Sequence, residues 1–241
     1  MTKLLSICAA AFAFASAFTA QAEPVFYKVG PFDQLQVRGN VNVVYRCNPD
    51  STGFATYNDD FCKNEPFELS VNNGKLQIKV LPELADPKNM PTIYLYSDFL
   101  KSVENEGDST VNVDLYAGVP VFSAKLIGNG HINVNNLRAT KVNVSLPTGA
   151  GQIVVSGKCD EASITMIGTG TIMADRLEAG KVSCKVVGTG TIGCWAEDKL
   201  DVRGLGTTKV FYRGNPEVKK VGLAKISALP EEKEETEEET D

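Results

Sequence analysis

The second half of the chain repeats a pair of glycines, separated by one residue, about every twenty residues. The second glycine of each pair falls at positions 130, 151, 170, 190 and 206, so the spacings are 21, 19, 20 and 16 residues. The pairs are Gly128 and Gly130, Gly149 and Gly151, Gly168 and Gly170, Gly188 and Gly190, and a degenerate fifth pair, Gly204 and Gly206. A repeat of this length is typical of one supersecondary unit stacked on copies of itself. We therefore expect these glycines to form the turns of the repeat.

Residues between the glycine pairs alternate between apolar and polar, as in the run Val142-Asn-Val144-Ser-Leu146. Alignment on the second glycine brings four isoleucines to one position, namely Ile132, Ile153, Ile172 and Ile192. A period of two indicates β-strands. A helical repeat is disfavoured because a glycine inside a helix costs about 1 kcal/mol. The sequence therefore predicts an all-β fold.

A single coil of this kind cannot fold alone. Each buried apolar side chain contributes roughly 1.5–3 kcal/mol, whereas ordering the backbone costs about 1–2 kcal/mol for every residue. Stacking reverses the balance because neighbouring coils share backbone ladders about 4.8 Å apart and continue the same apolar columns. We therefore predict a parallel β-helix, or β-solenoid, on which Lys141, Glu161 and Lys181 form an outward ladder of alternating charge.

The segment Gly188-Thr-Gly190-Thr-Ile-Gly193 also fits the glycine pattern of dinucleotide-binding sites. Those sites need a helix directly after the glycines. Here the Gly-x-Gly pair recurs in other coils without a helical pattern behind it. We therefore interpret these glycines as turns and expect no cofactor.

The chain begins with features of a secretory signal peptide. Lys3 precedes an apolar run from Leu4 to about Phe18, and Ala20-Gln-Ala22 then forms a small-residue cleavage site. We predict that residues 1–22 are removed and that the protein is exported to the periplasm, the outer membrane or the exterior. Cys8 lies within the apolar run, and lipid anchoring there is a less favoured alternative. No later run is long and apolar enough to span a membrane.

The chain has a net charge of −6, and its acids are concentrated at the C-terminus. Residues 231–241 hold eight acids and one lysine, and we expect residues 229–241 to form a disordered acidic tail. This charge balance does not favour nucleic acid as a partner, since a nucleic-acid site needs a basic face.

Export makes disulfides possible among the five cysteines that follow the signal peptide. Cys47 and Cys62 flank a polar insert, and we predict that they form a disulfide, worth about 3 kcal/mol in the chain-entropy model. Cys184 and Cys194 fall on inward positions and are expected to act as small buried hydrophobic residues, and the pairing of Cys159 with either stays open. With one histidine and no Cys-x-x-Cys motif, no metal site is expected.

The part of the chain before the repeat is less regular. Short alternating runs lie between Val25 and Val103, and Asn72-Asn-Gly74 between two of them predicts a β-hairpin. We predict one domain over residues 23–228, with irregular strands over 23–103 and regular coils over 104–216. Antiparallel strands are expected to cap the start, because solenoids need caps to protect their open edges.

The order of these segments resembles a family of exported bacterial proteins, the putative autotransporter adhesin head, GIN-type domains. The resemblance runs from Phe32-Asp-Gln-Leu-Gln-Val-Arg-Gly-Asn-Val-Asn-Val through the Gly-x-Gly coils to Val210-Phe-Tyr-Arg-Gly-Asn-Pro216. It implies a β-solenoid in a surface or envelope setting. The insert at 48–61 and the acidic tail depart from the family, which brings no catalytic motif with it.

The pattern favours a non-enzymatic binding or structural module, because extended solenoid faces form large binding surfaces. The expected contacts are aromatic: Trp195, Tyr212, Phe54 and Tyr57. Trp195 follows the inward Cys194, so its ring is expected to point outward. The residues do not identify the ligand, and the candidates are a glycan or a protein of the envelope or host surface.

Two other functions stay open. A polysaccharide lyase or glycosidase on a β-helix gathers carboxylates on one outer face. Here Asn143, Ser163 and Ser183 stack where acids are needed, and the available acids, Asp160, Glu161, Asp175 and Glu178, fall at turns. The third possibility is a subunit of an envelope assembly that docks through an open end of the solenoid.

Overall fold

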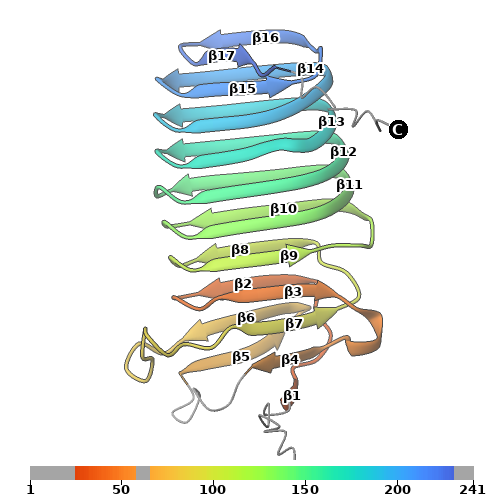
Figure 1. Cartoon of the computed structure of the whole chain (residues 1–241), viewed down its shortest axis with the longest axis vertical. Helices are drawn as coiled ribbons and strands as arrows, with labels where there is room; N and C mark the ends of the chain where they lie inside the picture. The colour runs from red at the N-terminus through yellow and green to blue at the C-terminus, as the bar shows by residue number, and fades with distance from the viewer. Residues whose placement is uncertain (1–24, 58–65, 231–241) are drawn as a thin grey trace, which may run out of the picture.

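A computed structural model describes residues 25–57 and 66–230, which form a rod of stacked β-coils (Figure 1). The strands are β1 (Val25–Lys28), β2 (Gln34–Arg38), β3 (Val43–Cys47), β4 (Phe54–Tyr57), β5 (Phe67–Asn72), β6 (Lys75–Val80), β7 (Ile93–Ser97), β8 (Ser102–Glu106), β9 (Thr110–Asp114), β10 (Val119–Ile127), β11 (His131–Thr148), β12 (Gln152–Gly168), β13 (Thr171–Gly188), β14 (Thr191–Gly206), β15 (Lys209–Arg213), β16 (Glu217–Gly222) and β17 (Lys225–Ala228). One short 3-10 turn, η1 (Pro49–Ser51), follows β3.

Each coil contributes one segment to each of two long parallel ladders. The first, which we name the β2 face, contains β2, β6, β8, β10, β16 and the second halves of β11 to β14. The second, the β3 face, contains β3, β7, β9, β15, β17 and the first halves of β11 to β14. The core lies between the two faces.

Equivalent residues lie above one another, which confirms the predicted β-solenoid. Ile132, Ile153, Ile172 and Ile192 are in direct register and fully buried. Outside the core, Lys141, Glu161 and Lys181 are in register as predicted, but only Lys141 and Glu161 form an ion pair, at 3.2 Å.

The N-terminal part is partly antiparallel, also as predicted. β4 pairs antiparallel with β1 and β7, and β5 with β6. The β5–β6 hairpin turns at Asn73 and Gly74, which have φ values of +49° and +76°. The stacking order differs from the chain order, because β2 lies between β6 and β8, and β3 between β7 and β9 (Figure 1).

The two glycines of a corner serve different purposes. Gly188 has a φ of +137°, a conformation that residues with a side chain rarely adopt. Gly190 has an ordinary φ, but a Cβ there would lie 2.3 Å from the carbonyl oxygen of Gly170 in the coil below. The first glycine therefore makes the turn, and the second allows the coils to approach.

The predicted fifth pair is wrong in its alignment. Gly206 is in register with Gly188, so it takes the place of a first glycine, with a φ of +109°. Gly204 is not a turn residue; it lies inside β14 above Val186. A Cβ at Gly204 would lie 2.8 Å from the Cβ of Ala224, a buried residue after β16. A larger side chain at position 204 would therefore collide with Ala224, so the column of inward side chains needs a glycine at this coil.

Several predictions fall outside the described residues. These are the signal peptide at 1–22, Cys62 with its predicted bond to Cys47, and the tail from 231 onward. Cys47 is half-buried, and its thiol donates a hydrogen bond of 2.7 Å to the carbonyl oxygen of Asp98. Over residues 25–57 and 66–230, the structure has no helix of the length and apolarity that crossing a bilayer requires.

Candidate functional site

A hollow of about 430 Å³ opens at the N-terminal end of the β3 face. We name it the aromatic pocket. It is lined by Phe26, Arg46, Cys47, Asn48, Ser51, Tyr96, Asp114 and Tyr116. Its size falls within the range of about 300–1,000 Å³ that is usual for small-molecule sites.

The central row of the pocket follows from strand register. Arg46 on β3 pairs with Tyr96 on β7 and with Asp114 on β9. Since side chains alternate along a strand, all three project from the same side of the sheet, while Tyr45 and Leu95 beside them are buried. The stacking thus brings an aromatic ring, a guanidinium and a carboxylate together from three separate segments.

Aromatic rings form the walls of the pocket. Tyr116 is 73% exposed and Phe26 is 54% exposed, which is unusual for rings of this size. The Phe26 ring lies 6.4 Å from the ring of Tyr96 and 6.5 Å from that of Phe54, which meets it edge to face. Such contacts hold Phe26 in place while its outer surface stays open to solvent.

The charged side chains of the pocket have hydrogen-bond donors and acceptors left for a ligand. The Arg46 guanidinium lies over the Tyr94 ring, 5.6 Å from its centre, and among the described residues it makes no ion pair. Asp114 accepts one hydrogen bond of 3.0 Å from the Asn135 amide. A guanidinium offers five donors, and a carboxylate about four acceptor sites, so most of this capacity remains available.

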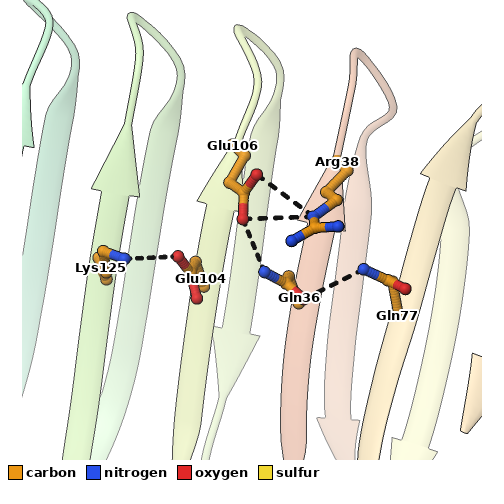
Figure 2. A network of polar contacts seen from close by, with 6 residues as sticks. All are labelled: Gln36, Arg38, Gln77, Glu104, Glu106 and Lys125. Carbon is orange, nitrogen blue, oxygen red and sulfur yellow. Dashed lines mark hydrogen bonds and ion pairs between the residues drawn. The ribbon is translucent and has the colours of Figure 1, made fainter.

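A second polar region lies on the β2 face and is occupied by its own contacts (Figure 2). Gln36 donates to the Glu106 carboxylate at 2.6 Å and accepts from the Gln77 amide at 3.2 Å. Arg38 also pairs with Glu106, at 3.3 Å, and Lys125 with Glu104, at 2.7 Å. This network links the coils of β6, β2, β8 and β10, so we assign it a structural role.

The four aromatic residues predicted as contacts do not form one site. Phe54 and Tyr57 are on β4, whereas Trp195 and Tyr212 are on β14 and β15 at the opposite end of the rod (Figure 1).

The Phe54 ring meets the Phe26 ring edge to face, and the Tyr57 ring stacks on Tyr27 at 4.4 Å. Tyr212 stacks above Cys194 and packs against the core, and the half-buried Trp195 donates its ring N–H to Glu197. Their role in binding stays a prediction.

The residues of the pocket that were not predicted from the sequence include the charged Arg46 and Asp114 and three aromatic residues, Phe26, Tyr96 and Tyr116. Two of them carried a usable signal, because in Ile93-Tyr-Leu95-Tyr96 and Val113-Asp-Leu115-Tyr116 the aromatic residue falls at the outward position. An aromatic side chain at an outward position is a candidate contact. Phe26 had no such signal, since its place depends on the antiparallel pairing of β1 with β4.

Three of the four carboxylates considered for catalysis are bound in ion pairs between coils, and the fourth, Asp160, is exposed. The pairs are Glu161 with Lys141 at 3.2 Å, Glu178 with Lys158 at 2.6 Å, and Asp175 with Arg213 at 3.7 Å. Each pair joins side chains from two different coils, so these carboxylates have a structural role. Within the described part of the chain, no group of three or more His, Cys, Asp or Glu side chains could hold a metal.

The buried thiols are not activated as nucleophiles. A hydrogen bond with the Cys194 thiol and burial together raise the pKa of Cys184 well above its ordinary value. Burial and the neighbouring Asp160 raise the pKa of Cys159 to about 12. Since the thiolate is the reactive form, these residues act as core side chains.

Comparison with models of known protein families identifies a family for this chain. A family model described as putative auto-transporter adhesin, head GIN domain, matches residues 31–216. A search of curated protein sequences gives no significant match.

Solved structures share the fold. A putative adhesin from Bacteroides fragilis is 21% identical, with a TM-score of 0.74 over 86% of this chain and 96% of that one. A putative lipid binding protein from Parabacteroides distasonis is 20% identical, with a TM-score of 0.59 over 86% and 95%. A putative adhesin from Parabacteroides merdae is 17% identical, with a TM-score of 0.59 over 85% and 94%.

Proposed function

Since its residues 31–216 match the model, the chain belongs to the family of the putative auto-transporter adhesin head GIN domain, and we propose that it is a non-enzymatic binding protein that holds a carbohydrate in the aromatic pocket. The observation that carries this proposal is the exposure of Phe26 and Tyr116 beside Arg46 and Asp114.

The chemistry of the pocket matches that of a sugar. One face of a pyranose ring presents C–H groups, which pack on the flat side of an aromatic ring. Its hydroxyls are donors and acceptors at once, and they can accept from the Arg46 guanidinium and donate to the Asp114 carboxylate. A pocket that offers both surfaces therefore favours a sugar over a purely apolar ligand.

We further propose that the protein is exported, and that it works in the periplasm, at the outer membrane or outside the cell. The support is the secretory pattern of residues 1–22 together with membership of an adhesin-like family. An exported rod with its binding pocket at one end can present that pocket away from a surface to which its other end is attached.

A glycan array with the full chain and two single variants tests the binding site. Tyr116→Ala removes an exposed ring without disturbing the core, so stability should change by less than about 0.5 kcal/mol. We expect it to weaken carbohydrate binding about tenfold or more, because aromatic anchors dominate contact energies. Trp195→Ala, at the other end of the rod, is the matched control and should leave binding unchanged.

The opposite result, with binding lost in Trp195→Ala and kept in Tyr116→Ala, would move the site to the C-terminal end. If no carbohydrate on the array binds the wild-type protein, the proposal is wrong.

A further inference from the structure

A second hollow, of about 330 Å³, lies on the β2 face and crosses four consecutive coils from β11 to β14. We name it the axial groove. One wall is the column Lys141, Glu161, Lys181 and Lys199, and the other is the column Asn143, Ser163, Ser183 and Asp201. Equivalent residues repeat about every 4.8 Å along it.

The charged wall leaves one cation without a partner. Lys141 pairs with Glu161 at 3.2 Å, and Lys199 pairs with Asp201 at 3.4 Å. Lys181 lies between these two pairs, is exposed, and makes no ion pair with any described residue. Its ammonium group is therefore free to bind an anion in the middle of the groove.

The opposite wall supplies hydroxyl donors. Ser163 and Ser183 are half-buried and in register, and neither side chain hydrogen-bonds within the described part of the protein. A serine hydroxyl can donate to a carboxylate or sulfate oxygen. Lys181 and these two hydroxyls therefore face one space.

The next outward column strengthens the positive charge. It continues the column of Glu104 and Lys125, which pair with each other at 2.7 Å (Figure 2), and it contains Lys185 and Arg203 on β13 and β14. Neither of these cations makes an ion pair with a described residue. In a chain with a net charge of −6, Lys181, Lys185 and Arg203 thus lie as unpaired cations in or beside the groove.

We propose that the axial groove binds an acidic polysaccharide, laid along the rod so that its acidic groups reach Lys181 and the neighbouring cations. The repeat of the coils is close to the length of one sugar unit in an extended chain, so successive units can lie beside successive coils, with Lys181 and the two serines near the middle of the groove. This site is separate from the aromatic pocket and does not depend on the function proposed for it.

Isothermal titration calorimetry with polygalacturonate tests the proposal, with dextran as the uncharged comparison. The wild-type chain is expected to bind polygalacturonate, more weakly as salt is raised, and not to bind dextran. The double variant Lys181→Gln, Lys185→Gln should bind about tenfold more weakly. The control is Lys209→Gln, Lys225→Gln, which removes two exposed lysines in register on the β3 face and changes the net charge equally.

Equal losses in the two double variants would show only a response to net charge, and the proposal would then be wrong. It would also be wrong if the wild-type chain bound dextran as tightly as polygalacturonate, or bound neither. Tyr116→Ala, measured in parallel, should bind polygalacturonate as the wild type does, which separates this site from the aromatic pocket.

Discussion

Single residues decide how closely the coils of this rod can stack. Gly149 illustrates the limit, because a Cβ there would lie 2.0 Å from the carbonyl oxygen of Gly128. Its φ of +100° is also one that L-residues with side chains avoid. Thr208, by contrast, stands near the position of a second glycine, and its hydroxyl donates to the Gly188 carbonyl oxygen at 3.0 Å. Thr208 thus shows that a corner can hold a side chain that hydrogen-bonds to the coil below.

The buried thiol of Cys159 makes the free energy of unfolding depend on pH. Burial and the negative Asp160 raise its pKa to about 12. In the unfolded chain the thiol ionises near pH 8.5. Between about pH 8.5 and 12 the unfolded state therefore binds fewer protons than the folded state, and the free energy of unfolding falls as pH rises. Cys184, whose pKa is also raised, acts in the same direction.

We predict that Cys159→Ala makes the protein less sensitive to alkali. In the ladder Cys159 lies between Ala139 and Ala179, so alanine fits the column and should cost about 1 kcal/mol at pH 7.5. At pH 10.5 the wild type should have lost about 2 kcal/mol more than the variant, relative to each protein at pH 7.5.

Urea unfolding under reducing conditions, followed by the fluorescence of the single tryptophan, measures both proteins. The substitution leaves every other ionisable side chain in place, so the comparison isolates the contribution of Cys159. Parallel losses in the wild type and the variant would contradict the assignment to Cys159.

At the scale of elements, each strand has one inward and one outward side, and β12 shows both. Ile164 is fully buried, whereas Ile167 on the same strand is 48% exposed. The energy of an apolar side chain on this rod therefore depends on its side of the strand.

We expect Ile164→Ala to lower the free energy of unfolding by about 2–5 kcal/mol, because it leaves a cavity between β11 and β13. Ile167→Ala should change it by less than about 0.5 kcal/mol. Urea unfolding of the two variants at neutral pH provides the comparison. Equal losses would mean that the coil is held by its backbone ladders and not by the apolar column.

The sequence predicted these elements well where they repeat. Alternation placed Ile132 and Ile153 in one column, and Asn73-Gly74 gave the hairpin between β5 and β6. The stacking order of the first coils could not be predicted, because β2 accepts either β6 or β8 as a neighbour on pattern alone. Gly206 was misaligned because β14 omits residues opposite Asp175 to Leu177, which shifts every later residue.

The candidate site could be predicted only in part. Arg46, Tyr96 and Asp114 come from segments far apart in the sequence, and they meet because β3 lies between β7 and β9. Local alternation predicts that each side chain points outward, but not which side chains become neighbours. The residues of the axial groove are easier to bring together from the sequence, since they recur at the repeat spacing.

At the scale of the whole molecule, the strands at the two ends of the rod are paired differently. The N-terminal end is covered by antiparallel pairings of β1, β4 and β5. At the C-terminal end, β16 pairs with β14 and β17 with β15, and neither has a second partner among the described strands (Figure 1). Such an edge presents free N–H and C=O groups on which a second chain can pair.

The C-terminal edge also exposes apolar side chains, which favour association with another chain. Val218 and Val221 on β16 are 40% and 56% exposed. Lys219 and Lys220 lie between them, and lysines on an edge strand oppose pairing because an approaching copy brings like charges together. We therefore expect these lysines to oppose association at the open end of the rod.

The prediction is that Lys219→Thr, Lys220→Thr self-associates, because threonine favours strand pairing and removes the repulsion. Sedimentation velocity over a range of concentrations should show a single small species for the wild type and larger species for the double variant. Lys158→Thr, Lys185→Thr is the matched control, since it removes two exposed lysines from β12 and β13, which already have partners on both sides. Association of both variants would point to lost net charge, and association of neither would mean that the shape of the last coil itself blocks pairing.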